Sequence, residues 1–339
     1  MQEMQEISRL IKETGKIYGY DADVYGFLYL ADHCGISFSG KKVLILGGGA
    51  TGRTAKAAAE KGGASAVVII SRSGEDNYTN LDRHYDADII INTTPVGMYP
   101  NCNEAPVDLT FFPMVTGVLD VIYNPLKTAL ILQADSLGIP CSGGLPMLVE
   151  HSVRQMSGGK DADENIEKIL QTATADIKNI VLIGMPGSGK TTVGKTLAKL
   201  LGRKFIDTDE EIVRKYHKTI PQIFAEGGED EFRKMEIDVI SELSKNKGCV
   251  IATGGGCVLK EENFIPLRQN SLIYWLHRDL SLLPTEGRPL SQAGKLDEML
   301  KARTPAYMHF ADVSVNNTGS IDDTAQKIAE TFLQDSSDY

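Results

Sequence analysis

Lys190 and Thr191 have the clearest chemical potential in this sequence, because they end the run Gly184-Met-Pro-Gly-Ser-Gly-Lys-Thr. The run satisfies the pattern G-x-x-x-x-G-K-[ST], in which backbone N–H groups of a glycine-rich loop surround phosphate groups. We expect the Lys190 ammonium to reach the β- and γ-phosphates of a nucleoside triphosphate, and the Thr191 hydroxyl to bind Mg²⁺. The predicted nucleotide-binding residues are Gly187, Ser188, Gly189, Lys190, Thr191 and Thr192.

Two carboxylates, Asp207 and Asp209, follow the short run Lys204-Phe-Ile. One residue, Thr208, separates the two aspartates at the end of this predicted strand, and we expect the two to have different partners. One can serve the metal and its waters while the other faces the phosphoryl acceptor. The alternative is that one of them only caps the predicted helix Glu210–Tyr216, since Asp is a favoured N-cap residue.

The elements around these residues predict one edge of a parallel sheet. Ile180–Ile183 and Val250–Thr253 are apolar runs typical of strands buried on both faces. The second run leads into Gly254, Gly255 and Gly256, which let a ligand approach the backbone closely; the alternative is a flexible turn. The segment Arg278–Gln292 is rich in glycine and proline and carries Arg288, which predicts a loop that closes over the nucleotide.

A second glycine pattern, G-x-G-x-x-G, places Gly47, Gly49 and Gly52 between the apolar run Val43–Leu46 and an alanine-rich helix. This order is typical of dinucleotide-binding domains, although a tight turn without any cofactor uses the same glycines. Where an NAD-binding domain carries Asp or Glu, this chain has Arg72. A guanidinium at that point suits the 2′-phosphate of NADP, and the alternative is a solvated surface arginine.

Length and composition restrict the class of protein. A chain of 339 residues predicts about two domains, which we place at 1–175 and 176–339. Both are predicted to be α/β domains with three layers around a parallel sheet: a Rossmann-type NADP-binding domain, then a P-loop domain. The resemblance given below implies that the second is a P-loop kinase domain like the nucleoside-monophosphate kinases. Residues 1–18 are predicted to form an amphipathic helix.

The net charge of -10 argues against a general nucleic-acid-binding protein. No apolar run reaches the length of a membrane span, and the polar N-terminus is unlike a signal peptide. The five scattered cysteines predict free thiols in a reducing cytoplasm. The sequence does not predict an oligomeric state.

Residues 178–334 resemble shikimate kinase. The resemblance rests on the motifs GMPGSGKTT, DTD, FRKME, GGG, GRPL and RTPAY, which occur in family order. It implies phosphorylation of the shikimate 3-hydroxyl by ATP and Mg²⁺. The catalytic residues are then Lys190, Asp209 and Arg288, of which Arg288 also binds ATP. The substrate-binding residues are Asp209, Arg233, Gly255 and Arg303, and the metal-binding residues are Thr191 and Asp207.

Residues 19–156 resemble the NADP-binding half of shikimate dehydrogenase, through GGGATG, SRS, INTTPVGM, DVIYNPLKT and GGLPMLVEHS. The implied NADP-binding residues are Gly47, Gly49, Gly52, Arg72 and Thr94. Asp23, Tyr123 and His151 stand at positions of the dehydrogenase site. In that family a substrate domain with a catalytic lysine precedes this region. Because the chain begins after it, we expect NADP binding without efficient dehydrogenation, in a truncated product or a scaffold.

Three functions therefore remain open from the sequence. The first is a shikimate kinase whose partners are shikimate and ATP, attached to an inactive dehydrogenase-like domain. The second is a bifunctional dehydrogenase and kinase, if the missing substrate domain is supplied. The third is another small-molecule kinase, for example one for gluconate or a nucleoside monophosphate, with an NADP-binding scaffold.

Overall fold

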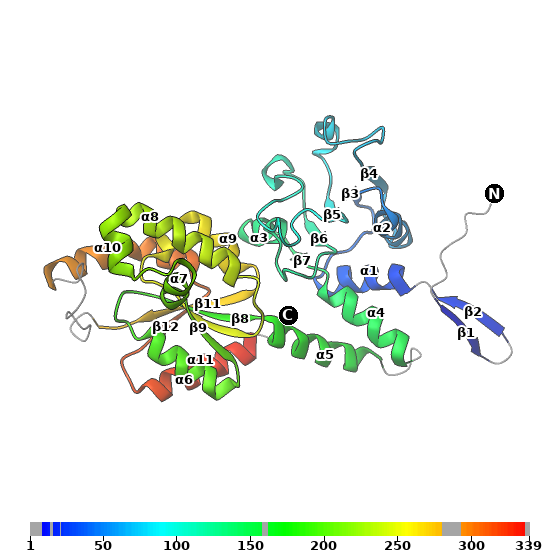
Figure 1. Cartoon of the computed structure of the whole chain (residues 1–339). Coiled ribbons are helices and arrows are strands. Elements are labelled where there is room, and N and C mark those ends of the chain that lie inside the picture. Colours follow the sequence, from blue (N-terminus) through cyan, green and yellow to red (C-terminus); the bar gives the residue numbers. More distant parts are fainter. Residues whose placement is uncertain (1–8, 14–15, 21, 158–161, 280–292, 336–339) are drawn as a thin grey trace. The chain divides into compact units, whose positions relative to one another are not determined.

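Two parallel sheets organise the chain in the computed structural model, which describes residues 9–13, 16–20, 22–157, 162–279 and 293–335 (Figure 1). Each sheet belongs to its own unit, the first spanning Met1–Leu170 and the second Gln171–Tyr339. Within the described residues, no helix is both long and apolar enough to cross a membrane.

The first unit contains a five-stranded sheet in the order β4-β3-β5-β6-β7, with every neighbouring pair parallel. Its strands are β3 (Lys42–Leu46), β4 (Ala66–Ile70), β5 (Ile89–Asn92), β6 (Gly117–Asp120) and β7 (Cys141–Ser142). Its helices are α1 (Ala22–His33), α2 (Ala50–Lys61), α3 (Ala129–Ser136) and α4 (Leu145–Ser157), and α5 (Ala162–Ile177) follows them.

The chain before α1 differs from the sequence-based expectation. Two short strands, β1 (Arg9–Glu13) and β2 (Lys16–Tyr20), pair antiparallel in place of the predicted helix over 1–18. The amphipathic pattern was too short to distinguish a helix from a strand. Ile17, Tyr18 and Gly19 all have weak helix propensity, and the first two favour strands. The prediction of a helix is therefore wrong for residues 9–13 and 16–18, and its other residues lie outside the described part of the chain.

The second unit contains a five-stranded parallel sheet in the order β12-β11-β8-β10-β9. Its strands are β8 (Asn179–Ile183), β9 (Lys204–Asp207), β10 (Cys249–Ala252), β11 (Ser271–His277) and β12 (Val313–Asn316). Its helices are α6 (Lys190–Leu201), α7 (Thr208–Tyr216), α8 (Ile220–Leu243), α9 (Phe264–Arg268), α10 (Ala293–Phe310) and α11 (Ile321–Asp335).

Alternation of side chains along the buried strands gives each sheet two cores. In β8, Ile180 and Leu182 pack with residues of α6 and α11, whereas Val181 and Ile183 pack with residues of α8 and α10. In β3, Val43 and Ile45 likewise face α1 and α2, and Leu44 faces α3. Burial on both faces explains why the strands are continuously apolar. The predicted class, two three-layer α/β domains with parallel sheets, is confirmed.

Candidate active site

The glycine-rich loop connects β8 to α6, as its sequence predicts. Gly189 is the N-cap of α6 with a φ of 97°, a conformation that glycine adopts without strain. A Cβ at this position would also lie 2.4 Å from the amide nitrogen of Asn317. The Lys190 ammonium donates to the carbonyls of Gly184 at 2.8 Å and Met185 at 3.0 Å, so it is held within the loop.

Ser188 is the one predicted loop residue that does not line the cavity described below. It is fully buried, and its backbone N–H donates to the Met185 carbonyl. Its own carbonyl accepts from the Asn317 side chain at 2.8 Å, and Asn317 in turn accepts from the Thr324 hydroxyl at 3.0 Å. Asn317 therefore ties the loop to the segment between β12 and α11.

Asp207 makes two hydrogen bonds in the site. Asp207 is the N-cap of α7, because its Oδ1 accepts from the backbone N–H of Asp209 at 3.0 Å. Its Oδ2 accepts from the Thr191 hydroxyl at 2.8 Å. Asp207 can therefore cap α7 and accept a hydrogen bond from Thr191 at the same time. Asp209 lies in the first turn of α7 and lines the cavity.

The pair of Thr191 and Asp207 fits Mg²⁺ in the chemistry of its donors. Both are hard oxygen ligands, and magnesium is usually bound by one or two carboxylates together with substrate phosphates and water. Among the described residues, no cluster of three or more His, Cys, Asp or Glu side chains could hold a metal by itself.

Each glycine of the triplet after β10 packs against a different part of the site. A Cβ on Gly254 would lie 2.9 Å from Asp209 Oδ1, and one on Gly255 would lie 2.6 Å from Pro186 Cδ in the glycine-rich loop. A Cβ on Gly256 would lie 2.2 Å from Nη2 of Arg233. The triplet is thus a close packing surface, and the alternative of a flexible turn is not what the structure shows.

Arg233 is 6% exposed and held by two acids of its own helix, α8. Its Nη2 lies 2.9 Å from Glu229 Oε1, and its Nη1 lies 2.6 Å from Glu236 Oε2. Burial lowers the pKa of Arg233, but the charges and hydrogen bonds of Glu236 and Glu229 raise it more. Arg233 therefore stays a cation in the site.

Glu236 is fully buried beneath the triplet. Burial raises the pKa of Glu236, the contact with Arg233 lowers it, and the charge of Asp209 raises it further, with a net upward shift. The sequence analysis gave Glu236 no role. Its spacing of three residues from Arg233 on one helix was the available signal, because residues i and i+3 are neighbours.

Arg303 on α10 approaches the triplet from the other side. Its Nη1 donates to the Gly255 carbonyl at 3.0 Å, and the side chain is buried. The same carbonyl accepts from the Tyr307 hydroxyl at 2.5 Å. Tyr307 lies one helical turn after Arg303, so both side chains lie on the same face of α10. The sequence analysis assigned no role to Tyr307.

These residues share one cavity of about 780 Å³. The predicted residues that line it are Gly187, Gly189, Lys190, Thr191, Thr192, Asp207, Asp209, Arg233, Gly255 and Arg303. Lining residues without a predicted role include Pro186, Ile220, Phe224, Phe232, Arg278 and Met299. Arg288 lies outside the described residues.

We expect Gly256→Ala to weaken binding of an anionic acceptor by about tenfold or more, a loss typical of one displaced charge-assisted contact. The added methyl would displace the Arg233 guanidinium, because the two would lie 2.2 Å apart. The measurement is the KM of the acceptor beside the Kd of ADP, which should stay unchanged. Gly319→Ala is the control, since its Cβ would meet only an Asp323 oxygen at 3.8 Å. An unchanged acceptor KM in Gly256→Ala would contradict this account.

In the first unit, the structure brings together part of the predicted NADP site. Gly47, Gly52 and Thr94 lie at the carboxyl ends of β3 and β5, where a Cβ on Gly52 would lie 2.0 Å from the Gly47 carbonyl oxygen. A Cβ on Gly49 would point into open space. Arg72 follows β4 and is exposed. The predicted assignment of these residues to NADP stays a prediction.

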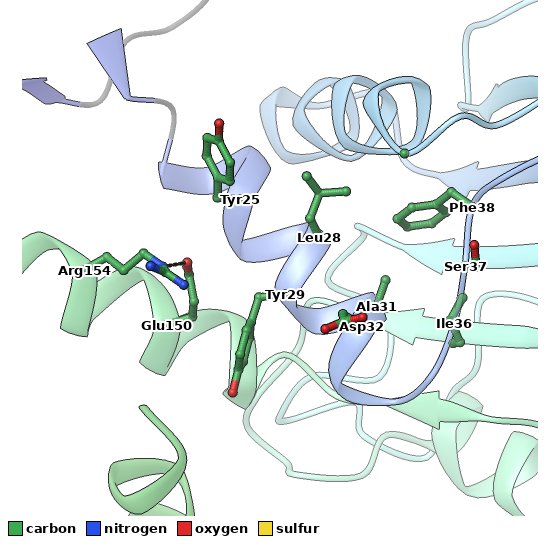
Figure 2. Close-up of a pocket in the computed structure, with 11 residues that line it drawn as sticks. Tyr25, Leu28, Tyr29, Ala31, Asp32, Ile36, Ser37, Phe38, Glu150 and Arg154 are labelled. Carbon is green, nitrogen blue, oxygen red and sulfur yellow. Dashed lines mark hydrogen bonds and ion pairs between the residues drawn. The ribbon is translucent and has the colours of Figure 1, made fainter. Parts of the chain in front are cut away.

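Two of the predicted dehydrogenase residues, Asp23 and His151, are in contact. His151 Nδ1 lies 3.0 Å from Asp23 Oδ1, whereas Tyr123 is 46% exposed. A separate cavity of about 440 Å³ is lined by α1, α4 and the segment Ile36–Phe38, and by none of these three residues. Its lining residues are drawn in Figure 2. It contains the ion pair of Arg154 with Glu150, and Tyr25, Tyr29 and Asp32 of α1.

A buried network holds Thr94. The Asn92 side chain accepts from the Thr94 hydroxyl at 2.7 Å and donates to both Asp120 oxygens at 3.1 Å. Asp120 also accepts from the Thr128 hydroxyl at 2.7 Å. Burial raises the pKa of Asp120 from 3.8 to about 6, against the lowering effect of its hydrogen bonds.

This raised pKa predicts a pH-dependent stability of the first unit. Between pH 4 and 6 the folded Asp120 keeps a proton that the unfolded chain has lost, so stability falls as the pH rises and then levels. From pH 4.5 to 7 the loss amounts to about 2 kcal/mol, at 1.36 kcal/mol per pH unit. We expect Asp120→Asn to remove this loss from the free energy of unfolding, measured with urea at a series of pH values.

Circular dichroism follows both units in that experiment, whereas the single Trp275 reports on the second unit. The difference in pH dependence between the wild type and Asp120→Asn should therefore appear in circular dichroism and be absent from tryptophan fluorescence. The same pH dependence in wild type and variant would refute the role of Asp120.

Three comparisons relate the chain to known proteins. The family model described as shikimate kinase matches residues 186–335. The shikimate kinase of Acinetobacter baumannii (strain AYE) is 42% identical over 167 residues, which cover 46% of this chain and 93% of that protein. The solved structure of shikimate kinase from Acinetobacter baumannii in complex with shikimate is 40% identical, with a TM-score of 0.46 and coverage of 49% of this chain and 98% of that chain. The structure of shikimate dehydrogenase 1 from Peptoclostridium difficile is 28% identical, with a TM-score of 0.40 and coverage of 47% and 63%.

Proposed function

The chain belongs to the shikimate kinase family, and we propose that it transfers the γ-phosphoryl group of ATP to the 3-hydroxyl of shikimate. The products are shikimate 3-phosphate and ADP. The observation that carries this proposal is the position of two buried arginines, Arg233 and Arg303, in the same cavity as Asp209 and the glycine-rich loop.

The charge of the cavity matches an acceptor that carries one carboxylate and several hydroxyls. Guanidinium groups bind carboxylates through two parallel hydrogen bonds, and the net charge of -10 makes such local cations necessary. Arg233 and Arg303 would take the carboxylate of shikimate, and Asp209 and the Gly255 backbone N–H would take hydroxyls. The apolar side chains Phe224 and Phe232 line the same cavity and can cover the ring.

Different residues of the site would carry out different parts of the reaction. The glycine-rich loop and Lys190 hold the triphosphate, and Thr191 with Asp207 would hold Mg²⁺, which neutralises charge on the phosphates when bound. Asp209 orients the 3-hydroxyl and accepts its proton as the hydroxyl oxygen bonds to the γ-phosphorus. The bond from that phosphorus to the bridging oxygen breaks, and ADP leaves. The assignment of Arg288 to catalysis and ATP binding stays a prediction.

A coupled assay of ADP release over a set of acceptors tests the function. We expect turnover with shikimate and none above background with gluconate or a nucleoside monophosphate. Gluconate makes a demanding comparison, because it too carries one carboxylate and several hydroxyls, on an open chain. Turnover with another acceptor and none with shikimate would replace this function by that of a different small-molecule kinase.

We also propose that residues 1–175 form an NADP-binding domain and that residues 176–339 form the kinase domain. The contact between Gly52 and Gly47 supports the first assignment, because such closely packed glycines are typical of dinucleotide-binding turns. Fluorescence titration with NADPH tests it, and absence of saturable binding would refute it. NADP added to the kinase assay then shows whether the domains are coupled, because thermodynamic linkage is reciprocal.

The partners that this proposal requires are shikimate and ATP. Nucleic acids are unsuitable ligands for a chain with a net charge of -10. The five cysteines are free in the structure, as thiols are in a reducing compartment, and the cytoplasm stays our prediction for the location.

A further inference from the structure

The strand order divides the cavity of the second unit into two sides. β8, which precedes the glycine-rich loop, is the central strand, with β10 and β9 on one side and β11 and β12 on the other. Asp207, Asp209 and the glycine triplet follow β9 and β10, so the acceptor residues lie on that side. Because all strands are parallel, the residues that follow β11 and β12 lie at the same edge of the sheet, on the opposite side of the loop.

Arg278 is the charged residue that the structure places on this opposite side of the cavity. It directly follows β11 and lines the cavity together with Gly189 and Lys190. Its Nη1 lies 3.8 Å from the position that a Cβ on Gly189 would occupy. Its guanidinium is therefore next to the first turn of α6, where backbone N–H groups face the cavity.

The guanidinium of Arg278 differs from those of the other cavity arginines in its partners. Its Nε atom is buried and has no hydrogen-bond partner within the described part of the chain. Arg233, by contrast, is paired with two glutamates, and Arg303 donates to a carbonyl. A buried donor without a partner destabilises the folded state, and an anionic ligand that accepts from it removes that cost.

The loop next to Arg278 is also fixed in place. The Asn317 amide donates to the Ser188 carbonyl and packs against Gly189. Arg278 follows β11 and Asn317 follows β12, and these two strands pair with each other in the sheet. The distance between the guanidinium and the phosphate-binding N–H groups is therefore set by the sheet.

We propose that Arg278 binds the phosphates of the nucleotide that remain on ADP, on the side of the loop away from the acceptor. The inference rests on the proposed function, because that function places the γ-phosphoryl group toward Asp209. The α- and β-phosphates then lie toward β11 and β12. A guanidinium suits them, since it forms two parallel hydrogen bonds with phosphate oxygens. Arg278 thus supplies a cation from the sheet edge, in addition to Lys190 in the loop.

Calorimetric titration of the full chain with ADP and with adenosine tests this role. We expect Arg278→Ala to weaken ADP binding by about tenfold or more, the effect of one lost charge-assisted hydrogen-bonded contact. Adenosine has no phosphates, so its affinity should stay unchanged. The KM of ATP should rise with that of shikimate unaltered, and the salt dependence of ADP binding should decrease.

Two further variants complete the design. Arg278→Gln keeps hydrogen-bond donors without the charge and should also weaken ADP binding if Arg278→Ala fails to fold. Arg214→Ala removes the same charge from α7, where the side chain is 75% exposed and paired with Glu211, and should bind ADP like the wild type.

The outcomes separate this inference from the proposed function. Wild-type affinity for ADP in folded Arg278→Ala and Arg278→Gln would overturn the role of Arg278 and leave the kinase function intact. An equal loss of ADP and adenosine binding would overturn it as well, since the effect would then not concern phosphates. A wild-type chain that does not bind ADP would overturn both.

Discussion

Arg233→Ala is expected to lose about 30- to 4,000-fold in kcat/KM for shikimate, while the Kd of ADP stays unchanged. The range follows from the cost of removing one partner of a buried charged contact, 2–5 kcal/mol at 1.4 kcal/mol per factor of ten. The physical reason is that the buried guanidinium of Arg233 has no substitute on its side of Gly256 among the described residues. Steady-state kinetics with varied shikimate at saturating ATP give the value.

The same substitution leaves Glu236 buried without its cation, which by itself destabilises a protein by about 3–5 kcal/mol. The double variant Arg233→Met with Glu236→Gln separates the two effects, because it removes both charges. It should recover thermal stability and remain inactive with shikimate. Activity of the single variant equal to that of the wild type would eliminate the assignment of Arg233 to the acceptor carboxylate.

Asp209→Asn is expected to lower kcat by about 10²- to 10⁴-fold, the usual contribution of a positioned general base. The side chain keeps its size and its place beside Gly254, so the KM of shikimate should change little. An amide cannot accept the hydroxyl proton, and this is why the loss should appear in kcat. Single-turnover measurements would show whether the loss belongs to the chemical step.

Asp207→Asn is the matched control for this prediction. Asp207 accepts from Thr191 and caps α7, so its loss should weaken Mg²⁺ binding and be partly compensated by higher Mg²⁺. Excess Mg²⁺ should not restore Asp209→Asn. If Asp209→Asn kept the wild-type kcat, or if Mg²⁺ rescued it, the roles of the two aspartates would have to be exchanged or abandoned.

Much of the fold is predictable because its signals are local. Apolar runs such as Ile180–Ile183 identify strands that are buried on both faces, and glycines mark the turns into the next helices. The region of Ile17–Gly19 is an exception, since a short amphipathic pattern does not distinguish a helix from a strand. The choice there depends on strand pairing, which the local sequence does not contain.

The site was predictable to the extent that its residues stand in motifs. Asp209, Arg233 and Arg303 do line one cavity with the glycine-rich loop. The sequence left open which of the two aspartates caps α7, and the structure assigns the cap to Asp207. Tyr307 and Glu236 had no role before their contacts with Gly255 and Arg233 were seen.

By itself, the sequence determined that Lys190 and Thr191 end a phosphate-binding loop between a buried strand and a helix, because that geometry depends on neighbouring residues only. The tertiary structure alone decided what surrounds the loop. Gly254–Gly256, Arg303 and Arg278 come from three distant segments, and their distances depend on strand order and helix packing. Such contacts are long-range, so spacing along the chain carries no information about them.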